Sequence, residues 1–466
     1  MAARPGIGRR LAGAYFWLTA LTLAGALVLG GSDNWRGERI LILPALLLAA
    51  VAMLRVAGDS TVDPLRARLF WLLPLLLLAV PALQLVPLPG ALWSALPGRG
   101  QLAADLQREL GTSGWRPLSL TPFQTERALQ ALCVPCGLFM AASVLGGAER
   151  RRLLNVVLLI GGLSVPLGLF QIIDGPDSPL YFYTISNRDD AVGLFANRNH
   201  LASLLASLLP VTIGVLMDRV RHVTRPERDL RVWSLTALGV LLAVGATATR
   251  ARIGFVMLML SIVAAALVAW RFRRREPAAR RLRVWLRLGA VLALALIAQY
   301  TLYAFLQRLQ SEQAEDLRWQ LAGETLRLAA PARGLGFGIG SFPRIHDRLG
   351  DAVTDTRAYI NHVHDDYLEL WLEGGVPALL LAAAAVAALL WQLLRQWRAQ
   401  TSRSGADEAP HDSHRGTHLG AAFALLLLAL HSAVDYPLRT LAIEAYAALL
   451  AALLVGSVRP GRPLFA

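Results

Sequence analysis

The stretch LFWLLPLLLLAVPALQLVPL, residues 69–88, contains no charged side chain. An α-helix of this length is about 30 Å long, which matches the hydrocarbon core of a lipid bilayer. Similar apolar runs recur along the 466 residues, of which 55% are hydrophobic, and the mean hydropathy is +0.48. Because a soluble core cannot bury so many of these runs, the sequence predicts an all-α polytopic membrane protein.

The apolar runs divide the chain into about 12 transmembrane helices and one long loop. We place the helices at residues 11–30, 40–57, 69–88, 128–147, 153–173, 193–217, 232–249, 253–270, 288–306, 376–394, 419–435 and 441–456. Residues 1–306 then hold helices 1–9, residues 307–375 form a large, partly helical loop, and residues 376–466 hold helices 10–12. A polar segment near 399–418 is typical of a disordered linker.

The distribution of arginine predicts the orientation in the membrane. All 46 basic residues are arginine and the net charge is +14. With the N-terminus in the cytoplasm, the cytoplasmic segments hold 28 Arg and 10 acidic residues, and the other side holds 18 Arg and 22 acidic residues. This asymmetry follows the positive-inside rule. We therefore expect an inner-membrane protein with both termini cytoplasmic, the 307–375 loop on the periplasmic side, and no nucleic-acid partner.

The large loop contains two recognisable segments. Residues 311–330 place Leu321, Leu328 and several alanines at helical spacing, which predicts an amphipathic helix that carries Arg318. The following ARGLGFGIGSF, residues 332–342, does not fit the dinucleotide-binding pattern and no strand precedes it. A glycine-rich turn is the simplest interpretation, although such a turn can also present backbone N–H groups to a phosphate.

Histidines and carboxylates crowd the end of the loop in NHVHDDYLELWLEGG, residues 361–375. Three interpretations remain open from the spacing. The acids can complement the dipole of a helix start, the His and carboxylate groups can bind a metal, or a histidine can act in acid–base catalysis.

Further polar residues lie where other spans reach the outer side. Arg250 and Arg252 stand in ATRARIG, residues 248–254, where they either extend to the membrane interface or clamp an anion. Asn197 and Asn199 either cap a helix or belong to a functional site. For His431, Asp435 and Arg439 the alternatives are a functional site and a structural hydrogen-bond network.

Five segments together resemble the O-antigen ligase and polymerase superfamily of bacterial envelope glycosyltransferases. They are GLFANRNHLA at 193–202, ATRARIG at 248–254, the glycine-rich segment at 332–342, HVHDDYLELWLEGGVPALL at 362–380 and HSAVDYPLR at 431–439. They occur in the order seen in that family and extend over about half of the chain. QLVPLPGALWSALPGR, residues 84–99, is similar to the first outer loop of polymerase-like members.

The resemblance implies an enzyme that takes a glycan from undecaprenyl diphosphate at the periplasmic face, without metal or cofactor. The acceptor is lipid A-core for a ligase and a lipid-linked glycan for a polymerase. The resemblance assigns the diphosphate to Arg250 and Arg318 and the catalytic base to His364, with His362 as the alternative base. The family usually has Asn after this histidine, whereas this chain has Asp365, a carboxylate that can raise the pKa of the base.

Two questions remain open at this level. Ligases and polymerases share a donor and differ in acceptor, so the residues do not separate them, although 84–99 and 431–439 favour a polymerase slightly. A transporter or lipid flippase is the alternative outside the family. It is disfavoured because the ionisable groups gather at one face and not at mid-membrane.

Overall fold

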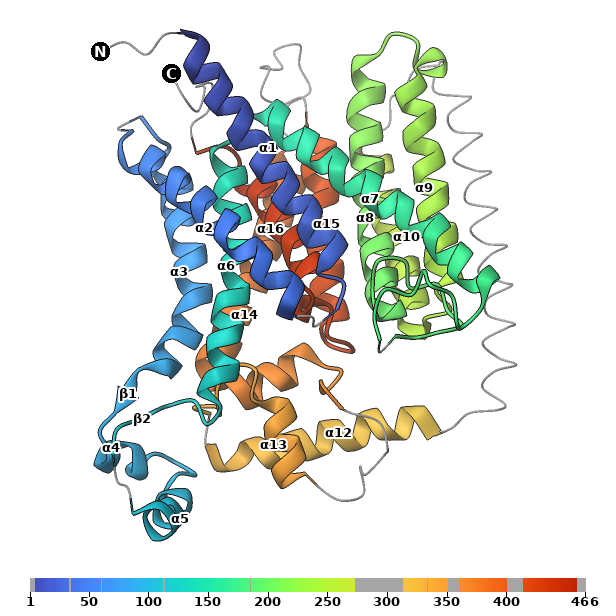
Figure 1. Ribbon diagram of the computed structural model, residues 1–466. Helices are drawn as coiled ribbons and strands as arrows, with labels where there is room; N and C mark the ends of the chain where they lie inside the picture. The colour runs from blue at the N-terminus through green and yellow to red at the C-terminus, as the bar shows by residue number, and fades with distance from the viewer. Residues whose placement is uncertain are drawn as a thin grey trace.

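The structure, a computed structural model, is built almost entirely of α-helices (Figure 1). It describes residues 5–32, 35–59, 61–111, 114–184, 186–272, 313–332, 334–350, 360–399 and 414–458. Eleven helices form a bundle, and smaller elements gather at the end of the bundle opposite the two termini.

Nine helices of the bundle are long and apolar enough to cross a membrane. They are α1 (Pro5–Leu29), α2 (Trp35–Ala57), α3 (Pro64–Leu85), α6 (Pro122–Val144), α7 (Gly147–Asp174), α8 (Arg198–His222), α9 (Leu230–Ala248), α10 (Arg252–Phe272) and α14 (Asp366–Ala399). Two shorter apolar helices are α15 (Arg415–His431) and α16 (Leu441–Val455). Eleven of the twelve expected spans thus coincide with apolar helices, and the span expected at 288–306 lies outside the described residues.

The remaining elements lie at the end of the bundle opposite the two termini, except for η1 (Pro226–Arg228) between α8 and α9. They are β1 (Pro87–Leu88), α4 (Gly90–Ala95), α5 (Gly100–Leu110), β2 (Arg116–Pro117), α12 (Gln313–Ala329), η2 (Ala330–Ala332), α13 (Phe342–Leu349) and η5 (Pro437–Arg439). The two strands pair antiparallel, with Pro87 opposite Pro117. Helix α12 confirms the amphipathic helix expected at 311–330.

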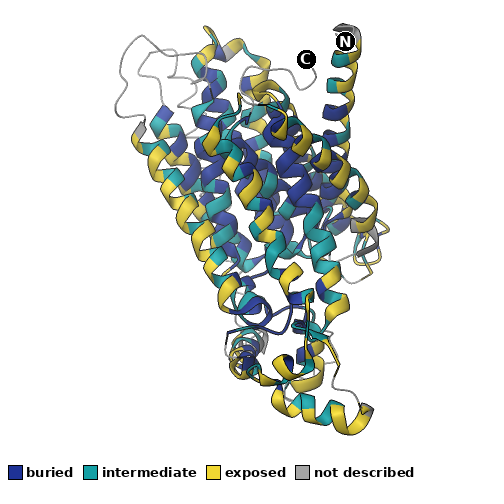
Figure 2. Cartoon of the chain, turned by 90° about the vertical axis from the view of Figure 1, so that its left-hand side faces the viewer, coloured by how far each residue is buried: buried dark blue, intermediate teal, exposed yellow. Residues whose placement is uncertain are grey.

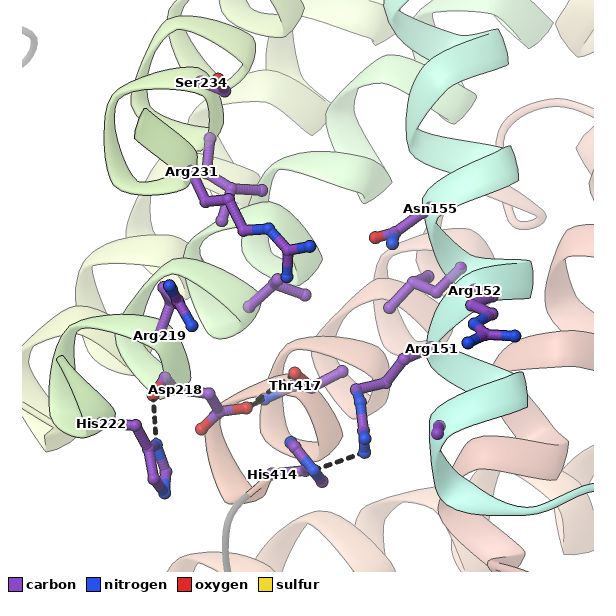
Figure 3. Close-up of a pocket in the computed structure, with 14 residues that line it drawn as sticks. Arg151, Arg152, Asn155, Asp218, Arg219, His222, Arg231, Ser234, His414 and Thr417 are labelled. Atoms are coloured by element: carbon purple, nitrogen blue, oxygen red, sulfur yellow. Dashed lines mark hydrogen bonds between the residues drawn. The ribbon is translucent and has the colours of Figure 1, made fainter. Parts of the chain in front are cut away.

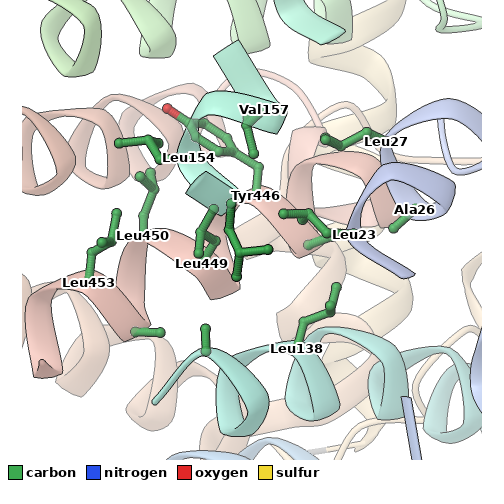
Figure 4. Close-up of a cluster of buried hydrophobic side chains, with 14 of the residues drawn as sticks. Leu23, Ala26, Leu27, Leu138, Leu154, Val157, Tyr446, Leu449, Leu450 and Leu453 are labelled. Atoms are coloured by element: carbon green, nitrogen blue, oxygen red, sulfur yellow. The ribbon is translucent and has the colours of Figure 1, made fainter. Parts of the chain in front are cut away.

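Buried residues fill the interior of the bundle and exposed residues lie on its outer faces (Figure 2). The core is largely apolar, and many large apolar side chains are exposed on the outer faces, as a lipid environment allows. Tyr446 of α16 is fully buried among leucines of α1, α6 and α7, including Leu23, Leu138 and Leu154 (Figure 4). Large side chains such as Leu43 and Ile173 remain more than three-quarters exposed on outward faces. Such residues would aggregate in water but are stable against acyl chains.

Small residues allow α8 and α15 to pack closely. A Cβ atom at Gly214 of α8 would overlap the carbonyl of Gly416, and one at Gly420 of α15 would overlap the carbonyl of Pro210. Close approach through glycine is characteristic of helix pairs in membranes. The close packing of α8 and α15 also brings together polar residues of the two helices, including Asn199 of α8 and His431 of α15.

Helix α14 differs from the sequence prediction, which started the tenth span at residue 376. The helix begins at Asp366 and contains a kink at Gly375, where φ is +62°. The segment between these residues is therefore helical, although it is rich in acids. The acids are tolerated in this helix because Arg439, in the link between α15 and α16, forms ion pairs with them.

The kink leads to a stability prediction. Alanine at Gly375 would keep an unfavourable positive φ, and its Cβ would overlap the carbonyl of Gly334. We expect Gly375→Ala to lower the free energy of unfolding by about 1–3 kcal/mol or more. Thermal unfolding in detergent measures this. Gly323→Ala is the control, because α12 has open space at that Cβ, and it should be neutral or slightly stabilising. Equal melting of the two variants would contradict the prediction.

Candidate active site

Three segments that are far apart in the sequence meet at one end of the bundle. They are the start of α8 near Asn199, residues 360–366 before α14, and the link 431–439 between α15 and α16. The N–H of Asp366 donates to the carbonyls of Ser432 (2.8 Å) and Asp435 (3.3 Å), which joins the second segment to the third. The packing of α8 against α15 places the start of α8 beside these two segments, and Asn199 contacts Asp435 there.

His364 and Asp435 form the central pair of this site. Nδ1 of His364 lies 3.2 Å from Oδ1 of Asp435 and donates its proton to the carboxylate. The Asp435 side chain is fully buried, whereas that of His364 is 29% exposed. When Nδ1 carries the proton, Nε2 presents a lone pair on the exposed side, and a buried carboxylate holds the imidazole in this tautomer. The pair has the arrangement of a general base with its positioning partner.

The backbone at His364 is strained. Among the described residues, three that are not glycine have positive φ, namely Asp189 (+82°), Arg250 (+53°) and His364 (+62°). Such conformations cost about 1–3 kcal/mol and occur preferentially at functional sites. Two of the three residues are ones for which the sequence predicted a direct role.

Asp435 is held ionised by its surroundings. Nδ2 of Asn199 donates to Oδ2 over 2.5 Å, and the N–H of Tyr436 donates to Oδ1 over 2.9 Å. His431 contacts Ser203 through Nδ1 and lies 3.9 Å from Oδ2 through Nε2. Burial raises the pKa of Asp435, but the hydrogen bond from His364 and the neighbouring histidines lower it further, so the pKa lies below its ordinary value. Asp435 therefore carries a negative charge at neutral pH.

Tyr436 is the packing centre of the site. Its ring lies 4.2 Å from the ring of His362, 4.8 Å from that of His200 and 5.0 Å from that of His364, measured between centroids. Its hydroxyl accepts a hydrogen bond from Nδ2 of Asn197 (3.3 Å).

In the parts of the chain that the structure describes, no group of three or more His, Cys, Asp or Glu side chains is placed to hold a metal ion.

His362, the alternative base, has a different environment. Its Nδ1 donates to Oε1 of Glu369 over 2.9 Å, and the other oxygen of Glu369 accepts from the N–H of Val363 over 3.0 Å. The side chain of His362 is only 9% exposed. His362 is thus buried against a carboxylate, and His364 is the more accessible of the two imidazoles.

Arg439 forms ion pairs with three buried carboxyl groups on the first turns of α14. It lies 2.7 Å from Glu373 and 3.4 Å from each of Glu369 and Asp366. These acids outweigh the effect of burial and raise the pKa of Arg439. Phe342 donates its N–H to Glu373 (3.0 Å), which attaches α13 to the network. Arg439 is therefore part of the framework that positions residues 360–366.

Asp365, the carboxylate next to His364 in the sequence, caps the start of α14. Its Oδ1 accepts hydrogen bonds from the N–H groups of Tyr367 (2.9 Å) and Leu368 (3.0 Å), which caps α14. Burial raises the pKa of Asp365, with these hydrogen bonds acting in the opposite direction. The carboxylate that contacts His364 is Asp435, which is 71 residues away in the sequence.

The glycine-rich segment lies along the kink of α14. The N–H groups of Phe337 and Gly338 donate to the carbonyls of Leu372 (3.0 Å) and Glu373 (2.9 Å). The N–H of Ile339 donates to the buried side chain of Gln84 (2.9 Å). These three donors are occupied within the protein, which supports the interpretation of residues 337–339 as a structural turn.

The remaining candidates also lie at this end. Asn197 caps α8 by accepting from the N–H of Asn199 (2.9 Å). Arg250 and Arg252 form the corner between α9 and α10, and Arg250 is exposed and within electrostatic range of Asp190. Arg318 is half-buried on α12 and within electrostatic range of His431.

Sequence reasoning missed several residues that shape the site. Tyr436 and His200 occur inside quoted motifs but gave no signal of their shared packing. Ser203 lies one turn after Asn199 on α8, and that spacing was the available indication. Gln84 lies in an apolar run, where a buried amide is itself a sign of an internal partner.

Residues 237–383 match the family model described as O-antigen ligase. This match confirms the resemblance inferred from the motifs. It covers about a third of the chain and contains Arg250, Arg252, Arg318 and His364, whereas Asp435 and Arg439 lie beyond it. No curated protein matches the chain.

Proposed function

We propose, on the premise that residues 237–383 match the O-antigen ligase family model, that the chain transfers a glycan from undecaprenyl diphosphate to an acceptor hydroxyl. His364 is the general base, Asp435 positions it, and Arg250 and Arg318 bind the diphosphate. The observation that carries the proposal is the hydrogen bond between a partly exposed His364 and a fully buried Asp435 inside this family context.

The reaction is a displacement at the anomeric carbon of the donor. The acceptor oxygen attacks this carbon as Nε2 of His364 takes the hydroxyl proton. The bond between the anomeric carbon and the phosphate oxygen breaks, and the electron pair leaves with undecaprenyl diphosphate. Negative charge grows on that phosphate, and the bidentate guanidinium groups of Arg250 and Arg318 stabilise it.

The orientation that we propose puts the site in the periplasm and both termini in the cytoplasm. The arginine distribution supports it. The two ends of the chain lie at the end of the bundle opposite α12 and α13 (Figure 1). A lipid-linked donor would reach His364 from the bilayer between the helices.

A purified transfer assay tests this function. The full chain in neutral detergent is incubated with a purified lipid-linked glycan and an acceptor, and undecaprenyl diphosphate and the glycan product are quantified. We expect both products in equal amounts. A transporter would instead move the donor across proteoliposomes and release no diphosphate, and that outcome would refute the proposal.

The choice between ligase and polymerase depends on the acceptor. We favour a polymerase-like activity slightly, because residues 84–99 and 431–439 resemble those members. A deletion strain separates the two: surface glycan limited to single repeats supports a polymerase, whereas long chains that accumulate on the lipid carrier support a ligase.

The pairing of Asp435 with His364 gives a kinetic prediction. In Asp435→Asn the amide can donate to Nδ1, which stabilises the wrong tautomer of His364 and places the proton on Nε2. We expect kcat to fall about 10²-fold or more, with little change in KM for the donor, because Asp435 does not touch the donor. Initial rates over a range of donor concentrations measure this split. A folded Asn variant with kcat within twofold of the wild type would show that Asp435 does not position the base.

A further inference from the structure

A separate cavity of about 740 Å³ lies at the other end of the bundle, between α7, α8, α9 and the start of α15 (Figure 3). Cationic and imidazole side chains dominate its polar lining. They are Arg151, Arg152, Arg219, Arg231, His222 and His414. The volume is in the range of small-molecule sites. In the orientation proposed above, the cavity faces the cytoplasmic leaflet.

The positive charge of this cavity is largely uncompensated. Asp218 is the only acid among the lining residues, and its oxygens accept from the N–H of Gly416 (2.8 Å), the N–H of Thr417 (2.8 Å) and the hydroxyl of Thr417 (2.7 Å). Arg219 pairs with Asp229 outside the cavity at 2.5 Å. Asp218 is therefore engaged in holding the start of α15, and one of the four arginines is already paired.

The other three arginines have no ion-pair partner in the part of the chain that the structure describes. Among the residues that the structure describes, no acidic side chain lies within ion-pair distance of Arg151, Arg152 or Arg231. Arg151 instead donates to Nε2 of His414 (2.5 Å). Burial and the neighbouring Arg151 lower the pKa of His414 to about 4, so this imidazole is neutral and accepts the proton. Figure 3 shows Arg231 extending from α9 and Arg151 from α7, on opposite walls.

The walls between these cations are apolar. Leu154 of α7, Val215 of α8 and Leu235 of α9 line the cavity. Outward from it, α7 and α9 expose large apolar side chains, including Leu159 and Trp233. A ligand that fits both features has an anionic head for the guanidinium groups and an apolar tail that continues along α7 and α9.

We propose that this cavity binds the phosphate headgroup of an anionic phospholipid of the cytoplasmic leaflet. Arg151 and Arg231 hold the phosphate from opposite sides, and one acyl chain lies against Val215 and Leu235. Basic pockets between transmembrane helices on the cytoplasmic side are a known mode of lipid headgroup binding. The bound lipid would bridge α7 and α9 at the end of the bundle far from His364.

Native mass spectrometry of the purified full chain tests the proposal. The protein in neutral detergent is titrated with dioctanoyl phosphatidylglycerol, dioctanoyl phosphatidylcholine or inorganic phosphate. We expect one phosphatidylglycerol per chain, bound at least about tenfold more tightly than either of the other two. In Arg151→Gln/Arg231→Gln we expect its affinity to fall by about tenfold or more. Arg9→Gln/Arg10→Gln is the matched control, because these exposed arginines on α1 lie outside the cavity, and it should bind within twofold of the wild type.

Three results would overturn the proposal. They are equal binding of phosphatidylcholine, equal losses in the two double variants, and inorganic phosphate binding as tightly as the lipid, which would make this a site for a soluble anion. If the double variant misfolds, the single Arg231→Gln variant replaces it, since Arg231 is an exposed residue on the first turn of α9. Its affinity should still fall several-fold, and an unchanged affinity would contradict the assignment.

Discussion

His364→Ala is expected to lower the rate of glycan transfer by about 10²- to 10⁴-fold, the usual contribution of a positioned general base. The acceptor hydroxyl then loses its proton acceptor, while the arginines proposed for the diphosphate are unaffected. The loss should therefore appear in kcat, with donor binding largely retained. Single-turnover transfer from a labelled lipid-linked donor measures the step directly.

His362→Ala is the comparison that identifies the base. His362 is buried against Glu369 and the ring of Tyr436, so its removal should reduce stability more than it reduces the rate per folded molecule. We expect the His362 variant to be at least about tenfold faster than the His364 variant when both are normalised to folded protein. The reverse order would assign the base to His362.

Arg439→Ala is expected to be the most destabilising single substitution in the site. It leaves Asp366, Glu369 and Glu373 buried without their shared cation. Removing one partner of a buried ion pair costs about 3–5 kcal/mol, because the remaining charge is uncompensated. Thermal or denaturant unfolding in detergent should show this loss, and transfer should fall because residues 360–366 lose their support.

Two controls define this result. Arg108 pairs with Asp105 at 3.5 Å, and both side chains are exposed, so Arg108→Ala should cost less than about 1 kcal/mol. Glu373→Gln in the Arg439→Ala background should recover part of the stability, since it removes one of the orphaned charges. Additive losses in the double variant would argue against a charge network.

The helices were largely predictable because the thickness of a bilayer sets the length of an apolar run. The predicted start of α14 was wrong because ion pairs with a distant residue allow acidic side chains to be buried in a helix. Residues 366–375 read as part of a polar loop, yet Arg439, more than 60 residues later, allows their carboxylates to be buried in α14. Hydropathy contains no information about such a partner.

The site was predictable as a set of residues but not as a set of contacts. His364 and Asp435 were both candidates from the motifs, but their pairing depends on the link between α15 and α16, and the sequence instead suggested the adjacent Asp365. The glycines at 334–340 predicted a turn, but its contacts with Leu372, Glu373 and Gln84 were not visible in the sequence. The role of Tyr436 was recognised only from the structure, where its ring contacts those of His200, His362 and His364.

The most direct test of His364 as the base is transfer by the purified His364→Gly variant. Glycine accepts the φ of +62° at this position without strain, so the substitution removes the imidazole and keeps the backbone. We predict a folded protein, a rate per folded molecule lower by about 10²-fold or more, and partial recovery on addition of imidazole. A stable Gly variant that transfers glycan at the wild-type rate would contradict the account.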